Sequence, residues 1–328
     1  MFLKTPRFWY EKDISSLRRF ILYPISRIYA LLARCAYWRP YRRRIRDVKV
    51  VAIGGVTVGG SGKSIVVASL AEILLALKKK TAVLSVGYGR SSWRALRVDP
   101  VVHTCVDVGD EPLMLSKKGI DVFVSKNRWK SARLALREQK YDVFLLDDGV
   151  VQKYLAPNIN LVVVDASQGI GNGEALPLGP LRIDFDTLKH SLNAIILLIH
   201  GEKQDYSEIK SCLPSNVPLI IGKLQQDLSR LDLETKYLAF CGIGYPRKFF
   251  DTLNRSLFVV REIDFPDHYP FSEKDMTQLL SEAESCGARL VTTEKDFARI
   301  PERFRELVSV VPIKIMWNDM EKIATYLL

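Results

Sequence analysis

The sequence of 328 residues lacks the features of several protein classes. Its five cysteines (Cys35, Cys105, Cys212, Cys241 and Cys286) are odd in number and form no C-x-x-C pair, which argues against a disulfide framework or zinc knuckle and favours a reducing compartment. No internal repeat is visible. The first residues, MFLKTPRFWYEKD, carry too many charges and rings to predict a signal peptide. A globular protein remains, since the hydrophobic content of 48% is ordinary for a folded chain.

Acidic residues are missing from one basic segment. Residues 18 to 46 contain nine arginines and no Asp or Glu, so this segment alone carries +9 of the formal net charge of +11. The excess positive charge is therefore confined to one segment and is not a property of the whole fold. No motif of a nucleic-acid-binding protein accompanies it. We expect no nucleic-acid partner.

The same segment has the pattern of an amphipathic helix. Ile21, Ile25, Ile28, Leu32 and Cys35 recur at helical spacing, and arginines interrupt the run before it reaches the ~20 residues of a membrane span. Three interpretations are open: a helix lying on an anionic membrane surface, a core helix with a solvated basic face, and a nucleic-acid arm. We favour the first and assign residues 1–46 to a membrane-surface segment.

Short apolar runs alternate with helix-length segments from Lys49 onward. The expected strands are KVVAIGG, TAVLSV, DVFVS, DVFLLDD, NLVVVDA and AIILLI. Runs rich in Val, Ile and Leu with this spacing predict an α/β fold, a parallel sheet with helices on both faces. Ligands of such sheets bind at the carboxyl ends of the strands.

A glycine-rich turn follows the first of these strands. The strict phosphate-loop pattern G-x-x-x-x-G-K-[ST] is matched except at its first glycine, where Thr57 stands. Gly59, Gly60 and Gly62 allow backbone N–H groups to face phosphate oxygens, Lys63 can reach the outer phosphates and Ser64 can ligate Mg²⁺. The predicted nucleotide contacts are Thr57, Val58, Gly59, Gly60, Ser61, Gly62, Lys63 and Ser64.

Two adjacent carboxylates end the fourth expected strand. Asp147 and Asp148 stand where phosphate-loop proteins hold magnesium, and two neighbouring carboxylates repel each other without a cation. We therefore predict Mg²⁺ ligands at Ser64, Asp147 and Asp148. No N-K-x-D guanine motif is present, so ATP is the expected nucleotide.

Eight motifs occur together and in order: TVGGSGKS, SVGYGR, VGDEP, DDG, GNGEALPLGPLR, AFCGIGYPRKFF, DHYPF and TTEKD. With them the chain resembles the tetraacyldisaccharide 4′-kinase family of lipid A biosynthesis. The resemblance implies transfer of the ATP γ-phosphate to the 4′-hydroxyl of a lipid-linked glucosamine disaccharide 1-phosphate. It also implies a peripheral, monotopic protein at the cytoplasmic face of the inner membrane, expected as a monomer. Two α/β lobes are implied, predicted at 47–235 and 236–328, with the strands KYLAFCGIG and RLVTTEKD in the second.

The resemblance also implies roles for individual residues. Asp110 of VGDEP corresponds to the catalytic aspartate, with His268 of DHYPF as its partner and Lys63 as a further catalytic group. The residues implied around the disaccharide and phosphates are Tyr88, Arg90, Glu111, Asn172 and Arg182. Glu294, Lys295 and Asp296 are at least as well explained as a structural charged cluster.

Some positions depart from the family pattern. Val86 and Ile183 stand where an arginine and a glutamate are usual, and Asp184 follows one place late. The family's D-D-G-F-Q-H is here continued by Val150, Val151 and Gln152. A changed acceptor, a slower enzyme and compensation by Asp184 are open. Two other functions stay open as well: a membrane-associated phosphate-loop ATPase acting as a switch, and a scaffold that has lost catalysis.

Overall fold

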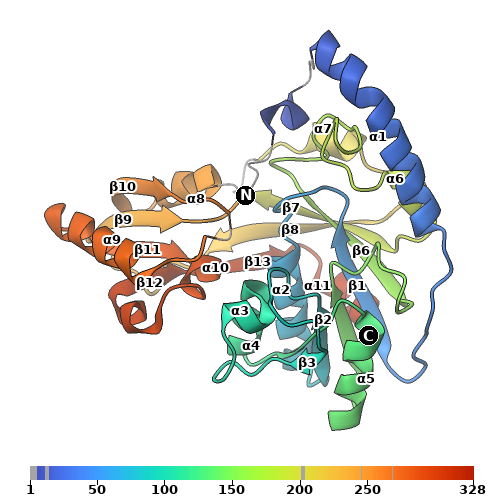
Figure 1. Cartoon of the computed structure of the whole chain (residues 1–328), viewed down its shortest axis with the longest axis horizontal. Helices are drawn as coiled ribbons and strands as arrows, with labels where there is room; N and C mark the ends of the chain where they lie inside the picture. Colours follow the sequence, from blue (N-terminus) through green and yellow to red (C-terminus); the bar gives the residue numbers. More distant parts are fainter. Residues whose placement is uncertain (1–5, 12–14, 201–203, 245, 268) are drawn as a thin grey trace.

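The computed structural model describes residues 6–11, 15–200, 204–244, 246–267 and 269–328 (Figure 1). Its larger sheet has nine strands in the order β13-β8-β7-β6-β1-β5-β2-β4-β3. Seven neighbouring strands are parallel, and β3 and β13 pair antiparallel at the two edges. The strands are β1 Lys49–Gly55, β2 Thr81–Ser85, β3 Leu96–Arg97, β4 Asp121–Val124, β5 Val143–Asp147, β6 Ile159–Asp165, β7 Ala194–His200, β8 Leu219–Gln226 and β13 Ile313–Trp317.

Helices cover both faces of this sheet, which explains why its central strands are apolar along their whole length. One face packs against α2 (Lys63–Ala76), α3 (Cys105–Val108), α4 (Asp110–Lys117) and α11 (Met320–Leu327). The other face packs against α5 (Arg128–Glu138), α6 (Phe185–Leu188), α7 (Ser207–Ser211) and the end of α1. The predicted fold class is confirmed, and the six expected strands are β1, β2, β4, β5, β6 and β7.

A second, four-stranded parallel sheet lies beside the first (Figure 1, left). Its order is β10 (Phe258–Asp264), β9 (Lys236–Cys241), β11 (Arg289–Thr293) and β12 (Val308–Val311). The helical segments of this part are α8 Pro246–Leu253, α9 Glu273–Ser285, α10 Glu294–Phe297 and η2 Glu302–Leu307. Two apolar clusters, one on each face, form its core.

The chain returns to the larger sheet at its end. β13 pairs with β8, and Ile315, Ile323 and Leu327 are buried in the same cluster as α2. Residues 313–327 thus lie in the nine-stranded sheet and its helical layer, although the predicted second lobe extended to residue 328. The division at residues 46 and 235 stays a prediction.

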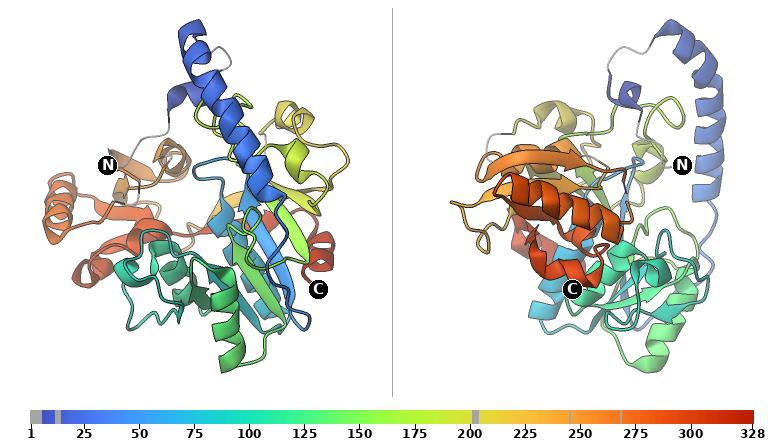
Figure 2. Two further views of the ribbon diagram at one scale, coloured as in Figure 1. Left: turned by 45° about the vertical axis from the view of Figure 1, so that its right-hand side comes forward. Right: turned by 60° about the vertical axis from the view of Figure 1, so that its left-hand side comes forward.

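The basic segment forms the long helix α1 (Ser16–Tyr37), which follows η1 (Arg7–Tyr10). Only Ser26 and Tyr37 of α1 are buried, and Phe20 is 81% exposed. The helix runs along one side of the molecule, and its first turns project beyond the rest (Figures 1 and 2). Within the described residues, no helix combines the length and apolar character that crossing a membrane requires.

Several side chains anchor this N-terminal part on the loop between β6 and α6. Ser26 donates a hydrogen bond to the Ala175 carbonyl (2.7 Å), and Trp9 Nε1 donates to the Pro177 carbonyl (2.9 Å). Arg34 forms an ion pair with Asp184 (2.9 Å). The loop between β6 and α6 is therefore fastened to both η1 and α1.

Candidate active site

The predicted phosphate loop joins the end of β1 to the start of α2. Gly62 has φ = 79°, and a Cβ there would lie 2.3 Å from Leu198 Cδ1, so this position requires glycine. No side chain caps α2, which leaves its first N–H groups pointing toward the loop, as phosphate binding requires. The predicted residues from Thr57 to Ser64 thus form one turn at the carboxyl end of the sheet.

The surroundings of Thr57 explain why this chain tolerates a threonine where the phosphate-loop pattern has its first glycine. This residue is buried and forms an antiparallel bridge with Leu181, and Val58 N–H donates to the Pro180 carbonyl (2.8 Å). Its φ is not among the positive values, so a Cβ at this position meets no backbone restriction. The loop after β6 therefore holds the first half of the turn in place.

Lys63 opens α2 and folds back over the turn. Its Nζ donates to Ser61 Oγ (3.2 Å), and a Cβ at Gly55 would lie 2.6 Å from that oxygen and 3.4 Å from the amine, so the glycine leaves room for both side chains. Burial lowers the pKa of Lys63, and the charges that act on the amine against this effect are Asp148, Asp147 and Glu111. The amine is thus held among carboxylates, in the environment expected before a phosphate arrives.

The two carboxylates after β5 lie in different surroundings. Asp147 is buried and accepts a hydrogen bond from Ser85 Oγ (2.8 Å). Burial, followed by the charge of Glu111, raises the pKa of Asp147 to about 6. Asp148, with φ = 51°, has both carboxylate oxygens bound by Arg182 (2.9 Å each). Burial would raise the pKa of Asp148, but Arg182 and Lys63 outweigh it and hold that pKa below the ordinary value.

Arg182 connects these groups to the phosphate loop. Besides Asp148, its guanidinium donates to the Gly55 carbonyl (3.1 Å), and its backbone N–H donates to the Val56 carbonyl (2.7 Å). An arginine bound to both a carboxylate and the loop backbone is preorganised, since its fork is already oriented. Arg182 therefore has a structural task whether or not it contacts a substrate.

The donor set at this edge fits a magnesium ion. Mg²⁺ prefers oxygen ligands and is often bound by one or two protein groups together with waters and phosphates. Asp147 offers a buried carboxylate, and Ser64 offers a hydroxyl in the first turn of α2. No cluster of three His, Cys, Asp or Glu side chains suited to a metal occurs in the described part of the chain. Because Arg182 occupies both oxygens of Asp148, Asp147 and Ser64 are the better candidates.

Three arginines, two of them beside these carboxylates, have a buried nitrogen with no acceptor among the described residues: Arg90 Nη2, Arg128 Nε and Arg182 Nε. Sequence reasoning missed Arg128, which is only 2% exposed and donates to the Asp147 carbonyl (2.6 Å) and the Ser125 carbonyl (3.1 Å). Its one sequence signal is its place just after the helix cap Asn127 at the carboxyl end of β4. Unsatisfied arginine donors are an anion-binding resource.

Asp110 and Glu111 begin α4 and reach the same edge. Glu111 forms an ion pair with Lys295 of α10 (3.2 Å), and Asp110 lies 3.6 Å from Arg299. Asp110 Oδ1 accepts a hydrogen bond from the Glu111 N–H (3.0 Å). Because Glu111 also acts on Lys63 and Asp147, VGDEP and the phosphate loop share one site.

The remaining predicted residues are placed differently. Tyr88 is exposed, and Arg90 donates to the Arg94 carbonyl (2.8 Å). The Asn172 amide donates to the Leu178 carbonyl (3.0 Å) and the Phe8 carbonyl (3.3 Å), and its oxygen accepts from Glu174 N–H (3.0 Å), so its side chain serves the loop itself. His268 lies outside the described residues. A substrate role for any of them stays a prediction.

Four of the residues at or beside the departures from the family pattern have structural explanations, whereas nothing in the structure explains Val86 or Val151. Ile183 and Val150 are buried in the core cluster between the sheet and α5, where a charge would be costly. Gln152 binds its own loop by accepting from Leu155 N–H (3.0 Å) and donating to the Leu155 carbonyl (2.6 Å). Asp184 caps α6 and pairs with Arg34, so both oxygens have local partners.

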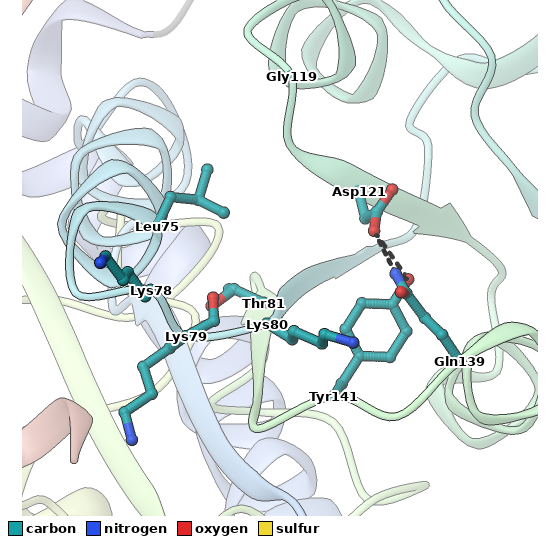
Figure 3. A pocket seen from close by; sticks show the side chains of 9 residues that line it. All are labelled: Leu75, Lys78, Lys79, Lys80, Thr81, Gly119, Asp121, Gln139 and Tyr141. Atoms are coloured by element: carbon teal, nitrogen blue, oxygen red, sulfur yellow. Dashed lines mark hydrogen bonds between the residues drawn. The ribbon is translucent and has the colours of Figure 1, made fainter.

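A cavity of about 310 Å³ lies at the opposite edge of the sheet (Figure 3). Its lining is formed by Leu75, Lys78, Lys79, Lys80, Thr81, Gly119, Asp121, Gln139 and Tyr141. The lysines follow the carboxyl end of α2, where positive charge complements the helix dipole. This position accounts for the lysines without a ligand.

Comparisons with known proteins agree with this geometry. A family model described as tetraacyldisaccharide-1-P 4′-kinase (LpxK) matches residues 18–328. A tetraacyldisaccharide 4′-kinase from Parvibaculum lavamentivorans is 37% identical, covering 97% of this chain and 95% of its own. One from Rhodopseudomonas palustris is 35% identical, covering 97% and 93%. The crystal structure of LpxK from Aquifex aeolicus, in complex with ATP, superposes with a TM-score of 0.73 at 25% identity, covering 94% of this chain and 98% of that chain.

Proposed function

The chain belongs to the tetraacyldisaccharide-1-phosphate 4′-kinase family, and we therefore propose that it transfers the γ-phosphate of ATP to the 4′-hydroxyl of a tetraacylated glucosamine disaccharide 1-phosphate. This transfer is a step of lipid A biosynthesis. One observation carries the proposal. Glu111, the neighbour of Asp110, is among the charges that act on both Lys63 and Asp147. The group proposed to receive the acceptor hydroxyl is thus adjacent to the groups proposed to hold the nucleotide.

The nucleotide side uses the open turn before α2. Gly59, Gly60 and Gly62 present backbone N–H groups to the phosphates, and Lys63 leaves Ser61 to reach the outer phosphate oxygens. A phosphate beside the amine favours its charged form, which offsets the burial that lowers the pKa of Lys63. The relative from Aquifex aeolicus was crystallised with ATP, which supports ATP as the donor here.

Asp147 and Ser64 would hold the magnesium ion. Bound there, Mg²⁺ supplies neutralisation of charge on the transferring phosphate. Asp148 instead orients Arg182 through its two hydrogen bonds and so stabilises the loop beside the metal site. The two adjacent aspartates therefore divide two tasks, one toward the ion and one toward the protein.

Asp110 is the proposed group for the acceptor side. Its Oδ1 accepts a hydrogen bond from the Glu111 N–H, and its Oδ2 faces Arg299 at the border between the two sheets. A carboxylate fixed in this way can accept the proton of the attacking 4′-hydroxyl, with His268 as its partner. Tyr88, Arg90, Glu111, Asn172 and Arg182 are proposed around the disaccharide, where arginine matches the acceptor's own phosphate.

The exposed face of α1 suits an acylated substrate in a membrane. Phe20, Ile28 and Leu32 are all more than half exposed, and arginines flank them. Such a helix lies on an anionic surface with its apolar side chains among the lipids. We place the protein as a peripheral monomer at the cytoplasmic face of the inner membrane.

Vesicle flotation tests this placement. Phe20→Asp combined with Leu32→Asp should abolish flotation with phosphatidylglycerol vesicles. Leu233→Asp, which alters an exposed leucine outside α1, should leave flotation unchanged. Equal flotation of the parent and the α1 double variant would remove the membrane-surface role.

The function is tested by labelled-phosphate transfer. The full-length protein is incubated with γ-labelled ATP and Mg²⁺ in detergent micelles, with or without the tetraacylated disaccharide 1-phosphate. We expect labelled lipid, and ATP consumption that depends on the acceptor. ATP hydrolysis at the same rate without acceptor, and no labelled lipid, would instead favour the phosphate-loop switch ATPase.

A further inference from the structure

Arg299 is a buried arginine beside the proposed catalytic carboxylate. It lies just after α10, and its side chain is only 6% exposed, as is that of Asp110. Three ion pairs cross the border between the two sheets here: Arg299–Asp110 (3.6 Å), Lys295–Glu111 (3.2 Å) and Lys118–Glu294 (3.1 Å). The first of them involves the proposed catalytic carboxylate.

The guanidinium is built into the smaller sheet. Nη1 donates to the Tyr269 carbonyl (3.2 Å), Nη2 donates to the Gly242 carbonyl (3.2 Å), and Nε donates to the Lys295 carbonyl (3.3 Å). Asp296 adds an ion pair at 2.9 Å. Four contacts from three separate segments fix the plane of the guanidinium, so that its contact with Asp110 comes from a preorganised fork.

Asp110 is fixed from its own side as well. It follows Gly109, where φ is 92° and a Cβ would lie 2.9 Å from the Tyr88 carbonyl oxygen, so the approach of the chain to α4 is determined. The Glu111 N–H holds Oδ1 at 3.0 Å, and Arg299 Nε faces Oδ2 at 3.6 Å. A contact of that length orients the carboxylate by charge and not through a short hydrogen bond from Arg299.

We propose that Arg299 is a positioning residue for phosphate transfer, which orients the Asp110 carboxylate toward the acceptor hydroxyl and links it to the segment at Tyr269. This inference rests on the proposed function, because it assigns Asp110 the acceptor proton. Tyr269 directly follows His268 in the chain, so one guanidinium connects the two motifs that supply the acceptor-side groups. The acceptor side is then complete only when the two sheets are in contact at this border.

The shape of arginine is essential to this role. Three carbonyls and two carboxylates surround a planar group with five N–H donors. Lysine at this position would keep the positive charge but would lose the planar, forked arrangement of donors, since its three N–H donors share a single nitrogen. Glutamine loses the charge. The two substitutions therefore separate orientation of Asp110 from simple charge neutralisation.

A double-mutant cycle tests the inference with the full-length protein, using labelled-phosphate transfer at saturating ATP. Misplacement of a reacting group by about 1 Å can cost about 100-fold, so we expect Arg299→Gln to lower kcat by about 10- to 100-fold and Arg299→Lys by less. KM for the acceptor and the affinity for ATP should change less than about threefold. Arg303→Gln, a matched change at an exposed arginine of the same part, should have no effect.

The decisive comparison is made in the Asp110→Asn background. If Arg299 acts through Asp110, Arg299→Gln should lower the residual rate there by less than about twofold. Equal losses in both backgrounds, or a loss that follows only the melting temperature, would overturn the inference. If Arg299→Gln does not fold, Arg299→Lys is taken through the same cycle. A parent protein that labels no lipid would instead overturn the proposed function, and this inference with it.

Discussion

Two strand-to-helix turns meet at the candidate active site, and they are built in opposite ways. One follows β1 of the nine-stranded sheet and leads into α2, and the other follows β11 of the four-stranded sheet and leads into α10. Both lie at the carboxyl ends of parallel strands, where α/β proteins bind ligands. The Lys295–Glu111 ion pair joins the second turn to the neighbourhood of the first.

The turn after β1 is open. A Cβ added at Gly59 or Gly60 would meet no atom within 4 Å, and the helix that follows has no capping side chain. The turn after β11 is closed. Thr293 caps α10, and Asp296, which is 0% exposed, accepts from Gly242 N–H (2.9 Å) and from Thr293 Oγ1 (2.6 Å).

The difference between the two turns shows that a strand-to-helix turn can be suited to either of two tasks. An open turn with unused N–H groups is suited to a phosphate, which supplies the missing acceptors. A closed turn has its polar groups satisfied internally and can hold a neighbouring side chain in a fixed place. We therefore infer that the turn of the larger sheet binds the nucleotide and that the turn of the smaller sheet holds a neighbouring side chain in position.

Lys63→Ala should give the largest loss. Removing the amine eliminates the charge that faces the outer phosphates, so ATP affinity and transfer should each fall by about 100-fold or more. Isothermal titration and labelled-phosphate transfer measure the two effects. Lys79→Ala, a change beyond the far end of α2, is the matched control and should match the parent in both assays.

Asp296→Ala should mainly cost stability. The change leaves the buried Arg299 without its closest carboxylate, and such losses cost about 3–5 kcal/mol. Denaturant unfolding should show this loss in the transition of the smaller sheet. Asp251→Ala, at an exposed position of α8, should change stability by less than about 0.5 kcal/mol. Similar effects of both changes would mean that the buried contacts of Asp296 do not stabilise the turn after β11.

Asp147→Asn should alter the pH dependence of folding without ligand. Because the pKa of Asp147 is raised to about 6 in the folded protein, the folded state retains a proton that the unfolded state has released, and stability falls as pH rises from about 4 to 6. The variant lacks this loss, and its free energy of unfolding should exceed that of the parent by about 3 kcal/mol at pH 7 in EDTA. Thermal melting from pH 4 to 8 measures the difference, and a constant difference would contradict it. Asp186→Asn, at an exposed carboxylate, is the control.

Gly60→Ala should have a smaller and more selective effect. The added methyl group meets no atom of the ligand-free protein and no positive φ is required, so the melting temperature should stay within about 2 °C. If phosphates fill the cradle, ATP affinity should fall by about tenfold, because the methyl group occupies space beside the loop backbone. Unchanged affinity would show that the open turn is not the phosphate site.

The sequence predicted the open turn because its determinants are contiguous. A strand, three glycines, Lys63 and Ser64 lie within one short segment, and each has a local physical reason. The strand alternation likewise predicted six of the strands that form the centre of the larger sheet.

The closed turn and its contacts depend on residues far apart in the chain. No local sequence pattern encodes these contacts. They include the contact of Asp110 with Arg299, the different partners of Asp147 and Asp148, and the hydrogen bonds of Asn172 within its own loop. β13 was missed for the same reason, since its pairing with β8 spans the whole smaller sheet.

We infer that the open turn binds ATP and that the closed turn positions Asp110, which receives the proton of the acceptor hydroxyl. The first measurement to make is single-turnover transfer from prebound, labelled ATP in Asp110→Asn, beside an ATP titration of the same preparation. We predict ATP affinity within about twofold of the parent and transfer lowered by about 100-fold or more. A loss of ATP affinity equal to the loss of transfer would contradict the division between the two turns.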